Sequence, residues 1–212
     1  MAATQVAEAV HLANEGYREN MDVEIRRMMP ADAAQYREIR LEGLKCSPEA
    51  FGSTYETESV QPLSRFSERL ASSAVFGAFR GAELLGIAGF AVRNGVKEAH
   101  KGLLWGMYVR PDARTAGVGR RLVEAVIDYA RQRVELLQLS VVSDNEQARR
   151  LYAGLGFVEY GVEQNSLKQH GRYYDEILMA LDLRQKQDAD AHTRRADATR
   201  CEERSSAAVA VG

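Results

Sequence analysis

The residues best suited to binding a ligand lie in a short turn that joins an apolar segment to an amphipathic one. Gly117 and Gly119 stand in this turn, with Arg114 before them and Arg120 after them. Glycine has no Cβ, so a ligand can approach the backbone closely. The first N–H groups of a helix have no partners within the helix and lie at the positive end of its dipole. With two arginines able to add charge-assisted hydrogen bonds, the turn predicts a phosphate-binding site.

Two common phosphate-binding motifs do not fit this turn. A dinucleotide-binding G-x-G-x-x-G motif needs a third glycine at position 122, where the sequence has Leu122. In a nucleotide P-loop the last glycine is followed by Lys and then by Ser or Thr, whereas Gly119 is followed by two arginines. A glycine turn that binds nothing stays open as an alternative, because a short motif often matches by chance.

The segments around the turn have clear periodicities. Residues 103–109 are apolar and predict a strand, and residues 136–142 have the nearly continuous apolar pattern of a strand buried on both faces beside a parallel neighbour. The helix after the turn has one apolar face, formed by Val118, Leu122, Val123, Val126, Ile127 and Ala130. A further helix is predicted over 145–153, with a capping box from Ser143 to Glu146.

The whole chain predicts a mixed α/β sheet flanked by helices. We expect further strands over 23–28, 74–80, 83–93, from 155 and over 172–183, helices over 30–45 and 62–72, and a loop over 52–61. The order β-α-α-β-β-β-α-β-α-β-β places a crossover helix between two parallel strands. Gly86, Gly89 and Gly106 inside strands predict bulges or close approach of another group to the backbone.

Length and composition are those of one globular domain with appendages. We expect an N-terminal extension over 1–21, the domain over 22–184, and a polar, disordered tail over 185–212. A net charge of −2 and a pI near 6.1 argue against nucleic acid, and no apolar run is long enough to cross a membrane. The N-terminus lacks a secretion signal, which predicts a cytoplasmic protein. Two cysteines and four scattered histidines predict neither a disulfide nor a metal site.

Two motifs resemble those of the GNAT superfamily of N-acetyltransferases, and the resemblance extends over about Val23 to Leu183. The first is Arg/Gln-x-x-Gly-x-Gly/Ala, matched by Arg114, Gly117 and Gly119. The second is N-x-x-A-x-x-x-Y-x-x-x-G-F, matched by Asn145, Ala148, Tyr152, Gly156 and Phe157. The resemblance implies a mostly antiparallel sheet with one splayed parallel strand pair, and direct transfer of an acetyl group from acetyl-CoA to an amine without a metal.

The resemblance also implies which residues bind the coenzyme. The turn would hold the CoA pyrophosphate, and the strand before it would pair its backbone with the pantetheine arm. The predicted binding residues are Met107, Tyr108, Val109, Arg114, Thr115, Ala116, Gly117, Val118, Gly119, Arg120, Asn145, Ala148 and Tyr152. Tyr152 is also the predicted general acid, because a phenol with a reference pKa of about 10 can protonate a leaving thiolate.

The general base and the acceptor stay open. Many family members carry a glutamate on or near the strand at 103–109, but this sequence has none there. The candidate bases are therefore Glu56, Glu58, Glu98, His100 and Asp175. Residues 51–58 and 171–176 are expected to build the acceptor site. A small amine or amino-acid-like acceptor, a protein N-terminus or lysine, and a non-catalytic CoA-binding module are the competing functions, and a homodimer is common in the family.

Overall fold

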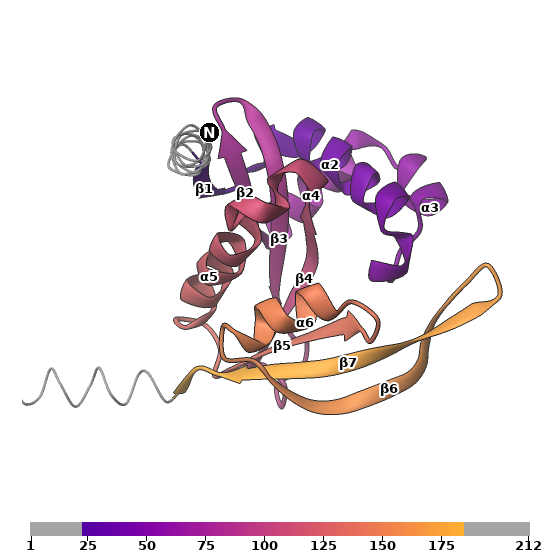
Figure 1. Ribbon diagram of the computed structural model, residues 1–212. Coiled ribbons are helices and arrows are strands. Elements are labelled where there is room, and N and C mark those ends of the chain that lie inside the picture. Colours follow the sequence, from indigo (N-terminus) through magenta and orange to yellow (C-terminus); the bar gives the residue numbers. More distant parts are fainter. Residues whose placement is uncertain (1–22, 185–212) are drawn as a thin grey trace, which may run out of the picture.

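The computed structural model describes residues 23–184, which form one seven-stranded sheet (Figure 1). The predicted extension over 1–21 and the predicted tail over 185–212 lie outside the described residues. The strand order is β1-β2-β3-β4-β5-β7-β6. The strands are β1 (Val23–Arg27), β2 (Ala74–Arg80), β3 (Glu83–Val92), β4 (Lys101–Val109), β5 (Leu136–Val142), β6 (Val158–Gln169) and β7 (Arg172–Asp182).

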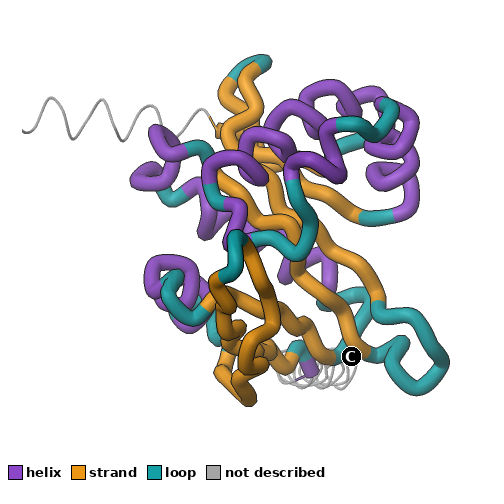
Figure 2. Tube along the Cα trace, turned by 90° about the vertical axis from the view of Figure 1, so that its right-hand side faces the viewer, coloured by secondary structure: helices purple, strands orange, loops and turns teal. Residues whose placement is uncertain are grey.

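Helices pack around the strands, as the turned view shows (Figure 2). The α-helices are α2 (Ala33–Cys46), α3 (Tyr55–Ser59), α4 (Leu63–Ser72), α5 (Val118–Ala130) and α6 (Glu146–Ala153). There are three short 3-10 helices in the described residues: η1 (Pro30–Asp32) between β1 and α2, η2 (Pro48–Ala50) between α2 and α3, and η3 (Pro111–Ala116) between β4 and α5. In the described part of the chain, no helix has the length and apolar character needed to span a bilayer.

The sheet has a hydrophobic core on each face. On one face, α5 packs against β1 to β4, and Leu122 and Val126 are fully buried there with Leu85 of β3. On the other face, α2 and α4 cover the sheet, and Tyr36 and Ile87 belong to this second core. Neighbouring side chains of β3 enter different cores, which explains its nearly continuous apolar sequence.

The pairing of β4 with β5 is short and parallel. Only residues 101–103 of β4 pair with residues 136–138 of β5, and the two strands then separate. All other neighbouring strands of the sheet are antiparallel. The predicted mixed sheet with one splayed parallel pair is therefore confirmed. The separation leaves residues 104–109 without a strand partner on the side that faces β5.

A bulge at Gly106 changes the direction of the side chains that follow it in β4. Trp105 pairs with Gly89 of β3, but Tyr108 pairs with Ile87, so β4 contains one extra residue between these pairs. Gly106 has φ +64°, a conformation that glycine adopts readily. As a result, Met107 packs toward the core under α5 while Tyr108 enters the core under α2. The bulge predicted from this strand glycine is confirmed.

Gly89 confirms the expected close approach of another group to the backbone of a strand. A Cβ at this position would lie 2.5 Å from the ring of Trp105, so only glycine lets the indole cross β3 at this distance.

Two local predictions are wrong. Residues 52–61 are not entirely a loop, because they contain α3, a helix too short to show apolar periodicity and capped by Thr54, whose Oγ1 accepts from the Thr57 N–H. Ser143 does not cap α6. The cap is Asn145, whose Oδ1 accepts a hydrogen bond from the Ala148 N–H at 3.1 Å. Asn145 immediately precedes the first helical residue, whereas Ser143 lies two residues too early to reach these N–H groups.

A buried ion cluster holds the segment between α2 and α4. Glu58, which is 4% exposed, accepts from Arg40 at 2.8 Å, from Arg69 at 3.1 Å and from the Ser53 hydroxyl at 2.7 Å. Burial alone would raise the pKa of Glu58, but the hydrogen bonds and charges of these partners outweigh it and lower the pKa to about 2. The ring of Phe51 covers the Arg40 guanidinium at 4.6 Å. The segment is thus fixed against α2.

Replacing Glu58 by Gln is expected to destabilise the fold by about 3 kcal/mol at neutral pH, because it leaves a buried guanidinium without its counter-charge. The lowered pKa means that this stabilisation is present above the pKa of the unfolded chain and is lost as pH falls toward 2. Urea unfolding should show the difference between wild type and Glu58→Gln shrinking by about 1 kcal/mol between pH 7 and pH 4. Glu56→Gln, on the exposed side of α3, is the matched control and should leave stability nearly unchanged. A pH-independent difference would contradict the prediction.

Candidate functional site

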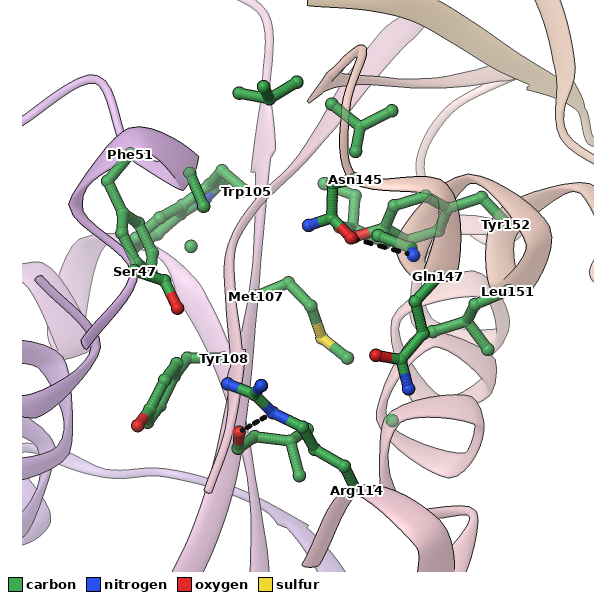
Figure 3. Close-up of a pocket in the computed structure, with 18 of the residues that line it drawn as sticks. Ser47, Phe51, Trp105, Met107, Tyr108, Arg114, Asn145, Gln147, Leu151 and Tyr152 are labelled. Carbon is green, nitrogen blue, oxygen red and sulfur yellow. Dashed lines mark hydrogen bonds between the residues drawn. The ribbon is translucent and has the colours of Figure 1, made fainter. Parts of the chain in front are cut away.

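A cavity of about 310 Å³ opens where β4 and β5 separate (Figure 3). Residues 104–109 of β4 and 140–142 of β5 form its two sides. The turn before α5 and one face of α6 border it on one flank, and η2 borders it on the other. The cavity therefore lies at the one place where the sheet is not continuous.

The β4 side of the cavity offers backbone groups to a ligand. Because residues 104–109 have no strand partner toward β5, their N–H and C=O groups on that side are free to pair with an extended ligand. Met107 projects into the middle of the cavity (Figure 3). Tyr108 and Val109 also line it, so these three predicted residues come together there.

The glycine turn closes one end of the cavity. Gly117 has φ +69°, in the left-handed region, and directly precedes α5. A Cβ on Gly119 would lie 3.2 Å from the terminal methyl of Met107, so glycine keeps this end open. Val118 lies between them with its side chain fully buried in the core, which leaves only its backbone for a ligand. Thr115 and Ala116 precede the turn in η3. The unpaired N–H groups at the start of α5 thus border the cavity.

Two arginines lie beside this turn. Arg114 donates from Nε to the Val109 carbonyl at 3.0 Å, and its terminal nitrogens point toward Met107 and Tyr108 (Figure 3). Arg120 also lines the cavity, although its Nε bonds Glu124 of the next helical turn at 2.9 Å. Positive charge and unpaired N–H groups therefore converge on one end of the cavity, which suits a phosphate.

One face of α6 continues the wall of the cavity beside this turn. Asn145, Ala148 and Tyr152 all line the cavity, as their spacing on one helical face predicts. Tyr152 is 5% exposed and packs edge-on against Phe157 with ring centres 5.8 Å apart. This burial raises the pKa of Tyr152 above the ordinary value of a phenol. The hydroxyl is therefore protonated at neutral pH, the form that a general acid requires.

A second cavity, of about 630 Å³, lies between the η2–α3 segment and the β6–β7 hairpin. Residues 51–56 line it on one side, and residues 166–170 with Tyr174 line it on the other. Of the two segments expected to form an acceptor site, the first contributes residues 51–56 to this cavity, whereas the second contributes only Tyr174. Glu49 and Phe51 line both cavities, so the two spaces adjoin at η2.

None of the five candidate bases lines the cavity between β4 and β5. Glu58 is held in the ion cluster, and an Asp175 carboxylate oxygen accepts from the Asn165 N–H at 2.8 Å. Glu98 and His100 precede β4, at the end where β4 and β5 are still paired. Glu56 lines only the second cavity. No local pattern distinguishes these five residues, because the position of the cavity depends on long-range strand pairing.

Some lining residues lie outside the segments predicted from the sequence. Ser47 and Glu49 reach the cavity because η2 lies against β5, as does Phe51 of the segment expected at the acceptor site, and Trp105 reaches it because it precedes the bulge. Gln147 could have been found, since it shares the exposed turn of α6 with Ala148. Within residues 23–184, no group of three or more His, Cys, Asp or Glu side chains is arranged to hold a metal ion.

Comparisons with known proteins agree with this geometry. Residues 39–157 match the model of the Acetyltransferase (GNAT) family. The [ribosomal protein bS18]-alanine N-acetyltransferase of Escherichia coli K12 is 35% identical over 98 residues, which cover 46% of this chain and 65% of that protein. An aminoglycoside N(6')-acetyltransferase type 1 of Stenotrophomonas maltophilia is 35% identical over 144 residues, covering 64% of this chain and 86% of that protein.

A solved structure has the same fold. The protein yncA of Salmonella typhimurium, a putative acetyltransferase whose structure contains its cofactor acetyl-CoA, superposes with a TM-score of 0.65. The two sequences are 24% identical, and the superposition covers 76% of this chain and 94% of that one.

Proposed function

The chain belongs to the acetyltransferase (GNAT) family, and we propose that it transfers the acetyl group of acetyl-CoA to a primary amine of a small or amino-acid-like molecule. One observation carries the proposal. The cavity between β4 and β5 has the positively charged glycine turn at one end and the protonated phenol of Tyr152 in its wall. These are the groups needed to hold a phosphate-bearing coenzyme and to protonate a leaving thiolate.

The residues fit acetyl-CoA, which supplies an activated acetyl thioester when it is bound. The α5 turn, with Gly117, Gly119 and the terminal nitrogens of Arg114, would hold the pyrophosphate. The open edge of β4 would pair with the pantetheine arm, and Asn145 and Ala148 would border that arm from α6. Support also comes from the Salmonella relative, whose structure contains acetyl-CoA.

The acceptor would enter from the second cavity, which adjoins the first at η2. The names of the two relatives given above indicate different acceptors. One is an alanine of a ribosomal protein, and the other is an aminoglycoside. A peptide or protein amine is the second candidate, because the second cavity lies between a helical segment and an extended hairpin and is the larger of the two.

The proposal is tested by calorimetric titration of the protein with acetyl-CoA and, separately, with CoA. Saturable binding of one acetyl-CoA per chain is expected. A thiol-release assay with L-alaninamide, putrescine, kanamycin and an alanyl peptide should then show turnover with at least one amine and rank the acceptor classes. A folded protein that binds no acetyl-CoA would overturn the proposal, and binding without turnover on any amine would favour a non-catalytic CoA-binding module.

Replacing Tyr152 by Phe is expected to lower kcat by about 100-fold or more, since a positioned general acid contributes that much. The phenyl ring keeps the packing against Phe157, so acetyl-CoA affinity should not change. Thiol-release kinetics and calorimetry measure the two effects. Tyr129→Phe, on α5 in contact with Phe76 and Phe90, is the control and should keep full activity. Unchanged turnover in Tyr152→Phe would remove Tyr152 from the mechanism.

Replacing Arg114 by Ala is expected to weaken acetyl-CoA binding about tenfold, the usual effect of losing a charge-assisted contact to a phosphate. The loss should decrease as salt concentration rises, because salt screens an exposed arginine. Arg65→Ala removes the same charge from the exposed surface of α4 and should leave the dissociation constant unchanged. Equal dissociation constants for wild type and Arg114→Ala would argue against a phosphate contact.

A further inference from the structure

Acetyl transfer to an amine needs a group that removes a proton, because a primary amine is mostly ammonium at neutral pH and has no free lone pair. Most carboxylates near the two cavities already have partners. Glu42 accepts from the Tyr108 hydroxyl and from Arg110, both at 3.0 Å. Glu176 accepts from the Ser140 and Ser166 hydroxyls at 2.7 and 2.6 Å. Glu58 lies in the buried ion cluster. These carboxylates hold the structure together and would have to break contacts to take a proton.

Glu49 differs from these residues in both its position and its contacts. It lies on η2, is half-buried, and is the one acidic residue that lines the cavity between β4 and β5. It also lines the second cavity, so its position is where the two spaces adjoin. Among the described residues, its carboxylate has no salt bridge and no hydrogen bond. Glu49 therefore combines access to the cavity between β4 and β5 with carboxylate oxygens that are free to accept a hydrogen bond.

The segment that carries Glu49 is held firmly although it is short. Pro48 begins η2, and η2 lies against β5. Immediately after it, Phe51 packs on the Arg40 guanidinium, and Ser53 bonds both Arg40 and Glu58 at 2.7 Å. The backbone at Glu49 is thus anchored on its C-terminal side to the buried cluster while the carboxylate stays unpaired. A base must be positioned in this way to act on a bound amine.

Cations at the second cavity do not neutralise Glu49. The Lys45 ammonium lies over the Tyr55 ring, 4.3 Å from its centre, and the Lys168 ammonium bonds the Tyr173 hydroxyl at 3.0 Å. Both lysines are exposed, and neither forms a salt bridge or a hydrogen bond with Glu49. The negative charge that lies between the cavities is therefore available to a cationic acceptor.

We propose that Glu49 is the general base, and that it binds the ammonium group of an acceptor entering through the second cavity. This inference rests on the acetyltransferase function proposed above. Glu49 removes one proton from R–NH3+, and the freed lone pair forms the C–N bond as the C–S bond of the thioester breaks. Tyr152 gives its proton to the sulfur and regains one from the nitrogen, which leaves the neutral amide. Glu49 then releases its proton to water.

The test compares wild type with Glu49→Gln, using acetyl-CoA and the panel amine that wild type acetylates fastest. Glu49→Gln should lower kcat/KM at pH 7 by about 100-fold or more. Wild-type kcat/KM should fall at acidic pH, because a general base must be unprotonated to accept the proton. In Glu49→Gln, kcat/KM should instead rise tenfold per pH unit up to the pKa of the acceptor amine. Without the base, only amine molecules that are already unprotonated can react.

Controls separate a catalytic role from a structural one. Acetyl-CoA affinity and thermal unfolding should be the same for Glu49→Gln and wild type, since the Glu49 side chain makes no bond within the fold. Glu49→Asp should recover part of the rate together with the wild-type pH profile. Glu24→Gln, on the exposed side of β1 at the far edge of the sheet, should keep full activity.

The outcomes also distinguish this inference from the function on which it rests. A Glu49→Gln protein with wild-type kcat/KM and an unchanged pH profile would overturn the role of Glu49 and leave the acetyltransferase function intact. A large rate loss with the wild-type pH profile kept would also overturn it, because the titrating base would then be another group. If wild type neither binds acetyl-CoA nor acetylates an amine, both proposals fall together.

Discussion

The site depends on the point where β4 and β5 stop pairing. In a continuous sheet the backbone groups of both strands would satisfy each other, and no space would remain between them. Here the parallel pairing ends after residues 103 and 138, and the β4 edge beyond it faces a cavity. Such unpaired groups need a partner, which an extended ligand with its own amide groups can supply. The backbone at this gap therefore favours an extended ligand, independently of the side chains that line the cavity.

The bulge at Gly106 turns this gap into a site with two different sides. Without the extra residue, the strand would keep strict alternation, and Met107 and Tyr108 would exchange faces. With it, Met107 packs toward the core under α5, while Tyr108 joins Trp105 on the side of α2 and η2. A Cβ at Gly106, in this bulge, would lie 3.6 Å from Arg40 Nη1. The ion cluster that anchors η2 is therefore adjacent to the strand distortion that shapes the cavity.

How much could be predicted from sequence depended on the range of the interactions. The α5 helix and its turn were predictable because apolar periodicity, Gly117 and Gly119 are local signals, and the fold class and family followed from the order of such segments. Short-range errors arose where a signal was ambiguous, as for the cap of α6, where Ser143 and Asn145 are both good capping residues. Glu49, the base proposed here, could not be selected from the sequence for another reason. Its position depends on contacts between η2 and β5, about 90 residues apart in the chain, which no local pattern encodes.

The division of the site also explains why related proteins do not give the acceptor. The matched family region, residues 39–157, contains β4, the turn, α5, β5 and α6, which together build the cavity proposed for the coenzyme and carry Tyr152. The β6–β7 hairpin lies beyond that region, yet it forms one side of the second cavity. Coenzyme chemistry can therefore be shared among proteins whose acceptors differ as much as a ribosomal protein and an aminoglycoside. The base proposed on η2 lies at the border between the two cavities, between the part of the site built by the matched family region and the hairpin beyond it.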